Sequence, residues 1–238
     1  MFKKTIHRYR RTLRWGVRLL FICLLIDIGY ILGLLPDWTH FADGPIQKSA
    51  FIMDYEYQQA VETDLPALQW RPVGLNKISS SVAQTIIVAE DHRFYRHSGI
   101  DTEAFTEAWG HNFEKGRIVY GGSTISQQMI KNVLLTPSRN PLRKWHELWL
   151  TLSLERNIDK DRILEVYLNI AEFGVGVYGV EAASRHYWGK PAKALTMNQA
   201  IELAATLTAP RKHNPANRTD YFLKQIKKIK RNMGPLVK

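Results

Sequence analysis

The chain has 238 residues, of which 45% are hydrophobic, and a formal net charge of +11. That hydrophobic content excludes a wholly disordered chain, and the length fits one domain with an appendage. Residues 1–18 contain seven Lys or Arg and no Asp or Glu, so they carry +7 of the +11. The positive charge is therefore concentrated in a short basic head, and it gives no reason to predict a nucleic-acid partner.

An apolar run at residues 19–35 follows the basic head and predicts a transmembrane anchor. With residues 15–18 the run reaches the roughly 20 residues that cross a bilayer, and its Asp27 costs about 3 kcal/mol at mid-membrane. A cleaved signal peptide and a buried helix of a soluble domain are the alternatives. No small-x-small cleavage site directly follows the run, and the basic flank disfavours a soluble helix. The head is expected to stay in the cytoplasm, which places the rest of the chain beyond the membrane.

Residues 36–77 contain prolines at 36, 45, 66 and 72 and are predicted to form a connector, part of it ordered. Residues 78–238 are predicted to form one mainly α domain, because helical periodicity runs through most of them and alternating strands are scarce. In chain order, the predicted helices lie within residues 79–91, 121–135, 140–156, 159–174, 196–210 and 221–233.

Several of these helices have recognisable ends. Thr124 with Gln127 fits a capping box, a reciprocal pair of hydrogen bonds at a helix start, and the Thr-x-x-Gln sequence at 196–199 repeats it. Asn140 is a candidate N-cap and Pro141 suits the first position of that helix. The helix that begins at residue 159 is predicted to stop at Gly174.

Glu90 lies at the end of an apolar helical stripe. It follows Ile87 by three residues and Ile86 by four, so it shares their inward side, whereas Asp91 is turned about 100° away. Burial raises the pKa of a carboxyl group and makes it a better base near neutral pH. The alternative is a plain helix end, with Asp91 capping the next turn.

Glu147 is a second candidate carboxylate. Arg143 precedes it by four residues and Lys144 by three, so both cations lie beside it on one helical face. A surface ion pair is the common explanation for such spacing. These cations, however, stand in the first turn of a predicted helix, where the helix dipole is already positive, and Arg139 lies just before them. The sequence therefore predicts an anion site suited to phosphates.

A polar face on the helix of residues 121–135 carries Thr124, Gln127, Gln128 and Lys131. Glutamine amides suit sugar hydroxyl and acetamido groups, and a lysine suits a phosphate. A solvated polar face is an equally good explanation of the pattern. Histidines at 92 and 97 match no strong metal motif.

Two further stretches are amphipathic. Phe105, Trp109 and Phe113 recur at every fourth position, and they form either core or a face that dips into the membrane surface. In residues 221–233, apolar side chains lie on one side and lysines on the other. A packed terminal helix with a solvated basic face is the first interpretation, and contact with anionic lipid is the second.

Five motifs in order, between about residues 75 and 215, resemble those of the peptidoglycan glycosyltransferases, glycosyltransferase family 51. They are EDHRFYRHSG at 90–99, GGSTISQQMIKN at 121–132, RKWHE at 143–147, KDRILEVYLN at 160–169 and GVYGVEAASRHYWGK at 176–190. The fifth motif departs from the family pattern in having Trp188 where Phe is usual. Five motifs in the family's order make this resemblance very specific.

The resemblance implies a mainly α, lysozyme-like glycosyltransferase domain with a small membrane-touching jaw, preceded by one transmembrane helix. It implies an enzyme that polymerises lipid II, a disaccharide-pentapeptide on undecaprenyl diphosphate, into glycan strands with β-1,4 bonds and inversion. The chain ends soon after the fifth motif, which implies a monofunctional enzyme. The bacterial inner membrane is the expected location, with a cytoplasmic N-terminus and a periplasmic catalytic domain.

The resemblance also assigns roles to residues. Glu90 matches the catalytic base, and Glu147 matches a second glutamate that orients cations or assists a divalent ion. Asp91 is a candidate ligand for Mg²⁺ or Mn²⁺, the cations commonly used in the family. The positions matching substrate-binding residues are Thr124, Gln127, Gln128, Lys131, Arg139, Arg143 and Lys144. Glu165, Tyr167 and Asn169 are interpreted as structural.

Two alternatives remain open at this point. A lysozyme-like muramidase or lytic transglycosylase also needs one glutamate in a helical fold, but a hydrolase of finished glycan has no diphosphate to bind. The other alternative is a catalytically inactive, membrane-anchored glycan-binding protein. Expected partners are lipid II, the growing strand, the inner membrane and other proteins of cell-wall synthesis or division.

Overall fold

The computed structural model describes residues 2–107, 122–135 and 141–234. The chain divides into two compact units, Met1–Asp37 and Trp38–Lys238. The first unit is one long helix, α1 (Phe2–Leu34), whose segment Leu13–Leu34 is long and apolar enough to cross a membrane by length and composition. This finding agrees with the single spanning helix expected from the sequence.

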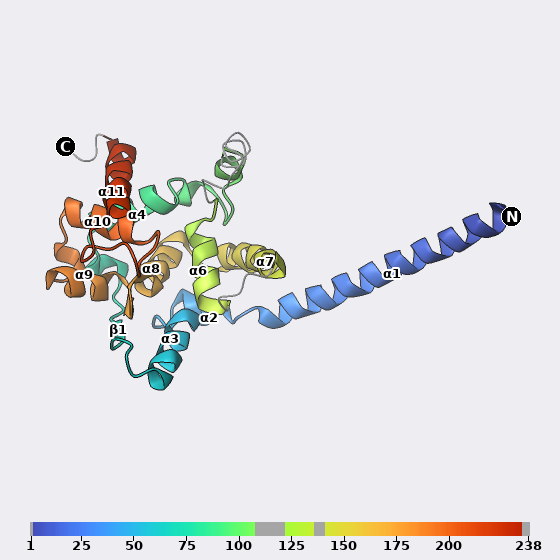
Figure 1. Cartoon of the computed structure of the whole chain (residues 1–238), viewed down its shortest axis with the longest axis horizontal. Coiled ribbons are helices and arrows are strands. Elements are labelled where there is room, and N and C mark those ends of the chain that lie inside the picture. The colour runs from blue at the N-terminus through green and yellow to red at the C-terminus, as the bar shows by residue number, and fades with distance from the viewer. Residues whose placement is uncertain (1, 108–121, 136–140, 235–238) are drawn as a thin grey trace. The chain divides into compact units, whose positions relative to one another are not determined.

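The second unit is mostly helical and contains one small three-stranded sheet (Figure 1). Its α-helices are α2 (Trp38–Ala42), α3 (Ala50–Val61), α4 (Ser80–Glu90), α6 (Ile125–Leu134), α7 (Pro141–Asn157), α8 (Lys160–Ile170), α9 (Val180–Trp188), α10 (Met197–Thr206) and α11 (Asp220–Met233). The strands are β1 (Gln69–Trp70), β2 (Glu172–Gly174) and β3 (Val177–Tyr178). β3 is central, parallel to β1 and antiparallel to β2. The prediction of a mainly α domain is confirmed.

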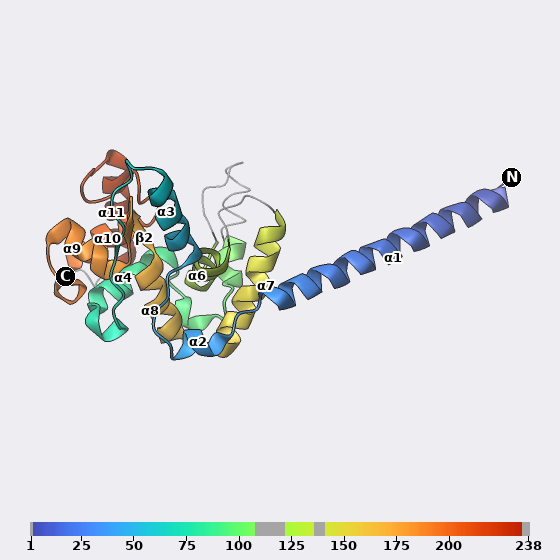
Figure 2. The ribbon, with the colours of Figure 1, turned by 90° about the horizontal axis from the view of Figure 1, so that it is seen from below.

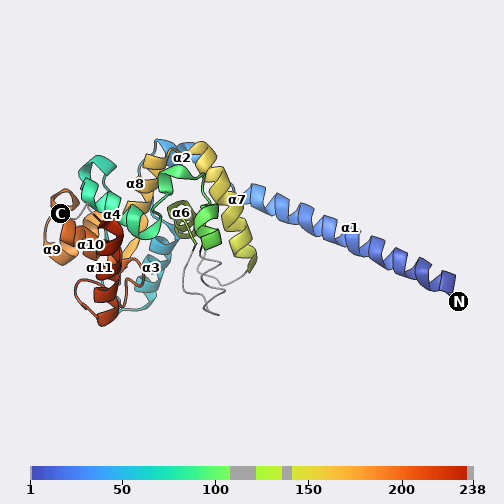
Figure 3. The same ribbon diagram turned by 90° about the horizontal axis from the view of Figure 1, so that it is seen from above.

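Two groups of helices build the core. α10 and α11 pack against α4, while α6 packs against α7 and α8, as Figures 2 and 3 show from opposite sides. Ile86 of α4 and Leu203 of α10 are fully buried in the first group, and Ile130 of α6 and Leu168 of α8 in the second. Because α4 ends where the two groups meet, the side chain at its last position lies between them.

The segment after α1 corrects the predicted connector at residues 36–77. From Trp38 onward it belongs to the compact unit, with Ile52 and Tyr55 of α3 buried and β1 paired to β3. The Tyr55 hydroxyl donates a hydrogen bond to the Pro66 carbonyl at 2.8 Å. Only two side chains of α3 are buried, so its sequence has too short an apolar pattern to reveal the packing.

Most of the predicted helix ends agree with the structure, and one does not. The capping boxes Thr124/Gln127 and Thr196/Gln199 are both present, and α7 begins at Pro141. The helix predicted to reach Gly174 is wrong at its end, since α8 stops at Ile170 and the next residues form β2. The chain then reverses through Gly176, whose positive φ of 72° suits glycine, and enters β3.

Candidate active site

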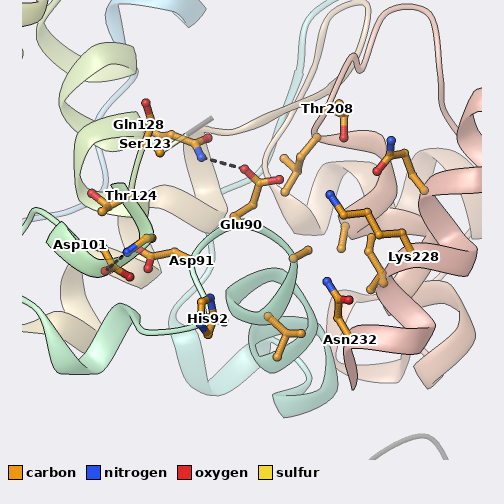
Figure 4. Close-up of a pocket in the computed structure, with 18 of the residues that line it drawn as sticks. Glu90, Asp91, His92, Asp101, Ser123, Thr124, Gln128, Thr208, Lys228 and Asn232 are labelled. Carbon is orange, nitrogen blue, oxygen red and sulfur yellow. Dashed lines mark hydrogen bonds between the residues drawn. The ribbon is translucent and has the colours of Figure 1, made fainter. Parts of the chain in front are cut away.

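A cleft of about 740 Å³ lies where the end of α4 meets the start of α6 and the helices α10 and α11 (Figure 4). Glu90 of α4, Gln128 of α6 and Thr208 after α10 line it, together with Lys228 and Asn232 of α11. The polar lining side chains come from α4, α6 and α11 and from the segments that follow α4 and α10 and precede α6. The cleft therefore depends on the packing of the second unit as a whole.

Glu90 is half-buried at the last position of α4, as its place on the apolar stripe predicted. Its Oε2 accepts a hydrogen bond from the Gln128 amide at 2.7 Å (Figure 4). Burial raises the pKa of the Glu90 carboxyl above its usual range, while the Gln128 hydrogen bond and the charges of Lys131 and Lys228 partly oppose the rise. The result is a carboxylate that binds a proton more readily than an exposed one.

Tyr167 of α8 fixes the amide that contacts Glu90. Its hydroxyl, fully buried, donates to Gln128 Oε1 at 3.1 Å, so the amide nitrogen is left facing Glu90. Residue 167 was interpreted as structural, and its link to the site was missed. The two partners are 39 positions apart, so helical spacing carries no signal for the contact.

Asp91 joins the end of α4 to the start of α6. The Ile125 N–H donates to Asp91 Oδ2 at 3.0 Å, and His97 Nε2 lies 3.0 Å from both Asp91 oxygens. The Gly99 N–H donates to His97 Nδ1 at 3.1 Å, which assigns the ring hydrogen to Nε2. The expectation that Asp91 differs from Glu90 in environment holds, but Asp91 is buried rather than capping an exposed turn.

The possible metal ligands Asp91, His97 and Asp101 have donor atoms within 4.8 Å of one another. Their donor atoms are already engaged, since Arg93 Nε donates to Asp101 Oδ2 at 2.8 Å and the Ala104 N–H donates to Asp101 Oδ1 at 2.8 Å. A guanidinium inside the group and hydrogen bonds to each carboxylate do not fit a resident divalent cation. The cluster instead fits a hydrogen-bonded support for the end of α4.

Glu147 lies in a separate cluster on α7. Its side chain is buried and pairs with Arg143 Nη1 at 3.2 Å and with Lys144 Nζ. Burial lowers the pKa of Lys131; Glu147 opposes this shift, whereas Arg143 and Lys144 add to it. Arg143 Nε is buried and makes no hydrogen bond to the part of the chain that the structure describes. The cluster therefore has more hydrogen-bond donors than the Glu147 carboxylate engages, and such a surplus of donors suits the binding of an anion.

The structure brings only some of the predicted substrate residues to the cleft. Gln128 and Thr124 line it, whereas Gln127 does not; the buried side chains of Thr124 and Gln127 form the capping box, and Thr124 Oγ1 also donates to the Gly99 carbonyl at 2.7 Å. Arg139 lies outside the described residues, as do Trp109 and Phe113 of the aromatic stripe. Phe105 is described and is exposed.

One wall of the cleft was missed from the sequence. α11 buries Phe222, Ile229 and Met233, which confirms the packed terminal helix. Its polar side does not simply face solvent, because Lys228 and Asn232 line the cleft with Glu90 (Figure 4). Tyr221 and Gln225 precede them on the same side, and the four residues follow one another at helical spacings of four, three and four residues. The sequence shows this helical spacing, but it does not show that Glu90 lies across the cleft from these side chains.

The fold and the site define a class: a mainly helical protein with a half-buried glutamate of raised pKa in a polar cleft, and with a cluster of cations around a second, buried glutamate. Residues 59–234 match the family model described as Transglycosylase. The chain therefore belongs to the transglycosylase family, and the predicted glycosyltransferase enzyme is confirmed.

Named relatives agree over most of the chain. A biosynthetic peptidoglycan transglycosylase of Laribacter hongkongensis is 39% identical over 223 residues, which cover 93% of this chain and 97% of that protein. A protein of the same name from Nitrosospira multiformis is 37% identical over 216 residues, 90% of this chain and 93% of its own length. One from Aeromonas hydrophila is 46% identical over 167 residues, 70% of each chain.

Proposed function

We propose that this enzyme polymerises lipid II into peptidoglycan strands. The growing strand, held on undecaprenyl diphosphate, would be transferred to the 4-hydroxyl of the lipid II N-acetylglucosamine, forming a β-1,4 bond with inversion. One observation carries the proposal: Glu90, with its raised pKa, faces a large polar cleft, and Lys131 links it electrostatically to the cations around Glu147. Names of the relatives support peptidoglycan as the polymer concerned.

Glu90 acts as the general base in this proposal. Gln128 engages Oε2, so Oε1 takes the proton from the acceptor hydroxyl as that oxygen attacks the anomeric carbon of the donor. The bond from that carbon to the diphosphate oxygen breaks in the same displacement. Because the raised pKa strengthens the carboxylate as a base, proton transfer at neutral pH becomes easier.

The leaving diphosphate gains negative charge in the transition state. Lys131, Arg143 and Lys144, with Arg139, are proposed to bind it, since fixed cations aimed at developing charge lower the barrier. Glu147 then acts as a positioning residue, because it holds Arg143 and Lys144 together when no anion is bound. A buried carboxylate between two cations suits that task better than proton transfer.

We propose that Mg²⁺ or Mn²⁺, the cations implied by the resemblance, would bind with the substrate diphosphate. Asp91 is not proposed as a ligand, because its oxygens are already bonded to His97 and Ile125. Asp91→Asn is therefore expected to change activity while leaving its dependence on added Mg²⁺ or chelator the same as in the wild type.

The expected setting is the bacterial inner membrane. α1 would anchor the enzyme, with its basic start in the cytoplasm and the second unit in the periplasm. Lipid II and the growing strand are the proposed partners, and other proteins of cell-wall synthesis or division would guide where strands are made.

A muramidase or lytic transglycosylase is the second candidate. The cation cluster argues against it, because cleavage of finished glycan releases no diphosphate. Purified full-length protein in detergent should convert fluorescent lipid II to polymer on a gel and leave preformed peptidoglycan intact. Degradation of peptidoglycan with no use of lipid II would replace this proposal, and inactivity on both would favour a glycan-binding protein.

A further inference from the structure

A second cavity, of about 410 Å³, lies between β1 and α9. Residues 68–71 line one side of it, and Ala182, Arg185 and His186 line the other. It shares no lining residue with the cleft at Glu90, and none of its lining residues is acidic. The cavity is therefore a separate feature of the second unit, and its lining carries positive charge.

α9 covers the face of β1 on which Arg71 lies. His186 Nδ1 lies 3.2 Å from Gln69 Oε1, and side chains two residues apart on a strand share a face. Arg71 is exposed and makes no hydrogen bond or ion pair with the residues that the structure describes. Its guanidinium can therefore meet a ligand without breaking a contact among those residues.

Arg185 is oriented by a buried acid. Its Nε donates to Glu181 Oε1 at 2.6 Å, while the Ala192 N–H donates to Glu181 Oε2 at 2.7 Å. Within the described ranges, Nη1 and Nη2 of Arg185 make no hydrogen bond. A guanidinium held through Nε presents its two terminal nitrogens together, and such a fork suits the two oxygens of a carboxylate.

β1 also offers main-chain groups, because it is an edge strand in the order β1-β3-β2. The Gln69 N–H donates to the Gly176 carbonyl at 2.8 Å, so the N–H and C=O of the next residue, Trp70, face the opposite edge. No hydrogen bond joins these two groups to any part of the chain that the structure describes. Pro72 has no N–H, so only a short segment can pair with this edge.

We propose that this cavity binds an extended acidic segment of another protein, which pairs with the main chain of Trp70 and places a carboxylate against Arg71 and Arg185. Pairing with a sheet edge gives a peptide affinity, and a side-chain pocket beside the edge gives it specificity. Two arginines without an acid in the lining favour a carboxylate. The open main-chain groups of Trp70 favour a peptide over a free anion.

Fluorescence anisotropy with the full-length protein in detergent tests this proposal. The probe is a dye-labelled hexapeptide of alternating valine and glutamate with blocked ends. A second probe has lysine in place of glutamate, and a third carries N-methyl groups on its central amides. Arg71→Gln removes one cation and should leave the Tm unchanged, because Arg71 has no partner within the described residues. Arg156→Gln is the matched control, since Arg156 is exposed and does not line the cavity.

The glutamate peptide should bind saturably, and the lysine peptide should not. Arg71→Gln should weaken binding by about tenfold, the usual cost of one hydrogen bond to a charged group, and Arg156→Gln should leave it unchanged. N-methylation should abolish binding, because it removes the peptide donors that pair with the edge of β1.

Three results would overturn the proposal: no saturable binding of the glutamate peptide, equal weakening in the two arginine variants, or full binding of the N-methylated probe. Tighter binding of a soluble muramyl pentapeptide, added as a competitor, would also overturn it, because the ligand would then be peptidoglycan rather than a protein segment. Lipid II is not used, so the outcome is independent of the polymerase assay.

Discussion

Glu90 on α4 and Glu147 on α7 are the same residue type in opposite surroundings. Glu90 is half-buried, receives one hydrogen bond from a neutral amide and has a raised pKa. Glu147 is more deeply buried and is paired directly with two cations. Glu90 therefore binds a proton more readily than an exposed carboxylate, whereas Glu147 holds two cations together. The difference assigns the two glutamates different roles.

Replacing Glu90 should have the largest effect. Glu90→Gln removes the base while keeping the shape and the possibility of a hydrogen bond with Gln128, so lipid II polymerisation is expected to fall by about 10²–10⁴-fold. The assay is polymer formation on a gel at saturating lipid II. Activity within a few-fold of the wild type would end the assignment of Glu90 as base.

The same variant tests the electrostatics through stability. A carboxyl whose pKa is raised in the folded state favours folding in its protonated form, and that contribution is lost as pH rises through the folded pKa. At pH 7, above the usual glutamate range, Glu90 therefore opposes folding, and neutral Gln should unfold at the same or a higher Tm. The gap should close as the pH falls below the usual glutamate range. A lower Tm at pH 7 would contradict the raised pKa.

Replacing Glu147 should cost both activity and stability. Glu147→Gln leaves Arg143 and Lys144 without their shared carboxylate, and breaking a buried ion pair costs about 3–5 kcal/mol, less here because both cations reach water. We expect a drop in Tm and a loss of activity on the order of 100-fold. Glu147→Gln should thus lower the Tm, whereas Glu90→Gln should not, and this difference tests the contrast between the two glutamates. An unchanged Tm would show that the cluster is not a structural unit.

Tyr167→Phe should have a smaller effect. It removes one hydroxyl that orients Gln128, worth about 1 kcal/mol, so we expect a roughly fivefold loss of kcat with little change in KM. Tyr55→Phe is the matched control, because Tyr55 is equally buried and donates one hydrogen bond to a backbone carbonyl remote from Glu90. Equal losses in both variants would mean that Tyr167 acts only through stability.

Local features of the site were readable from the sequence. The apolar stripe under Glu90, the capping box at Thr124 and the cations three and four residues before Glu147 all follow from helical spacing. Each of these features depends only on the spacing of side chains within a single helix. The five ordered motifs then indicated the family that the comparisons show.

Contacts between helices were not readable. The hydrogen bond of Tyr167 to Gln128 and that of Ile125 to Asp91 join residues 39 and 34 positions apart. Spacing tells which side of a helix is apolar, but not which helix covers it. The packed segment from residue 38 and the α11 wall of the cleft were missed for the same reason.

The central claim is that Glu90, tuned by its burial and by Gln128, is the base. The most direct test is the pH dependence of kcat/KM for lipid II in the wild type and in Gln128→Leu. Because the Gln128 hydrogen bond lowers the pKa of Glu90, its removal should move the acidic limb of the profile to higher pH. An acidic limb that keeps its position, with only the plateau lowered, would contradict the account.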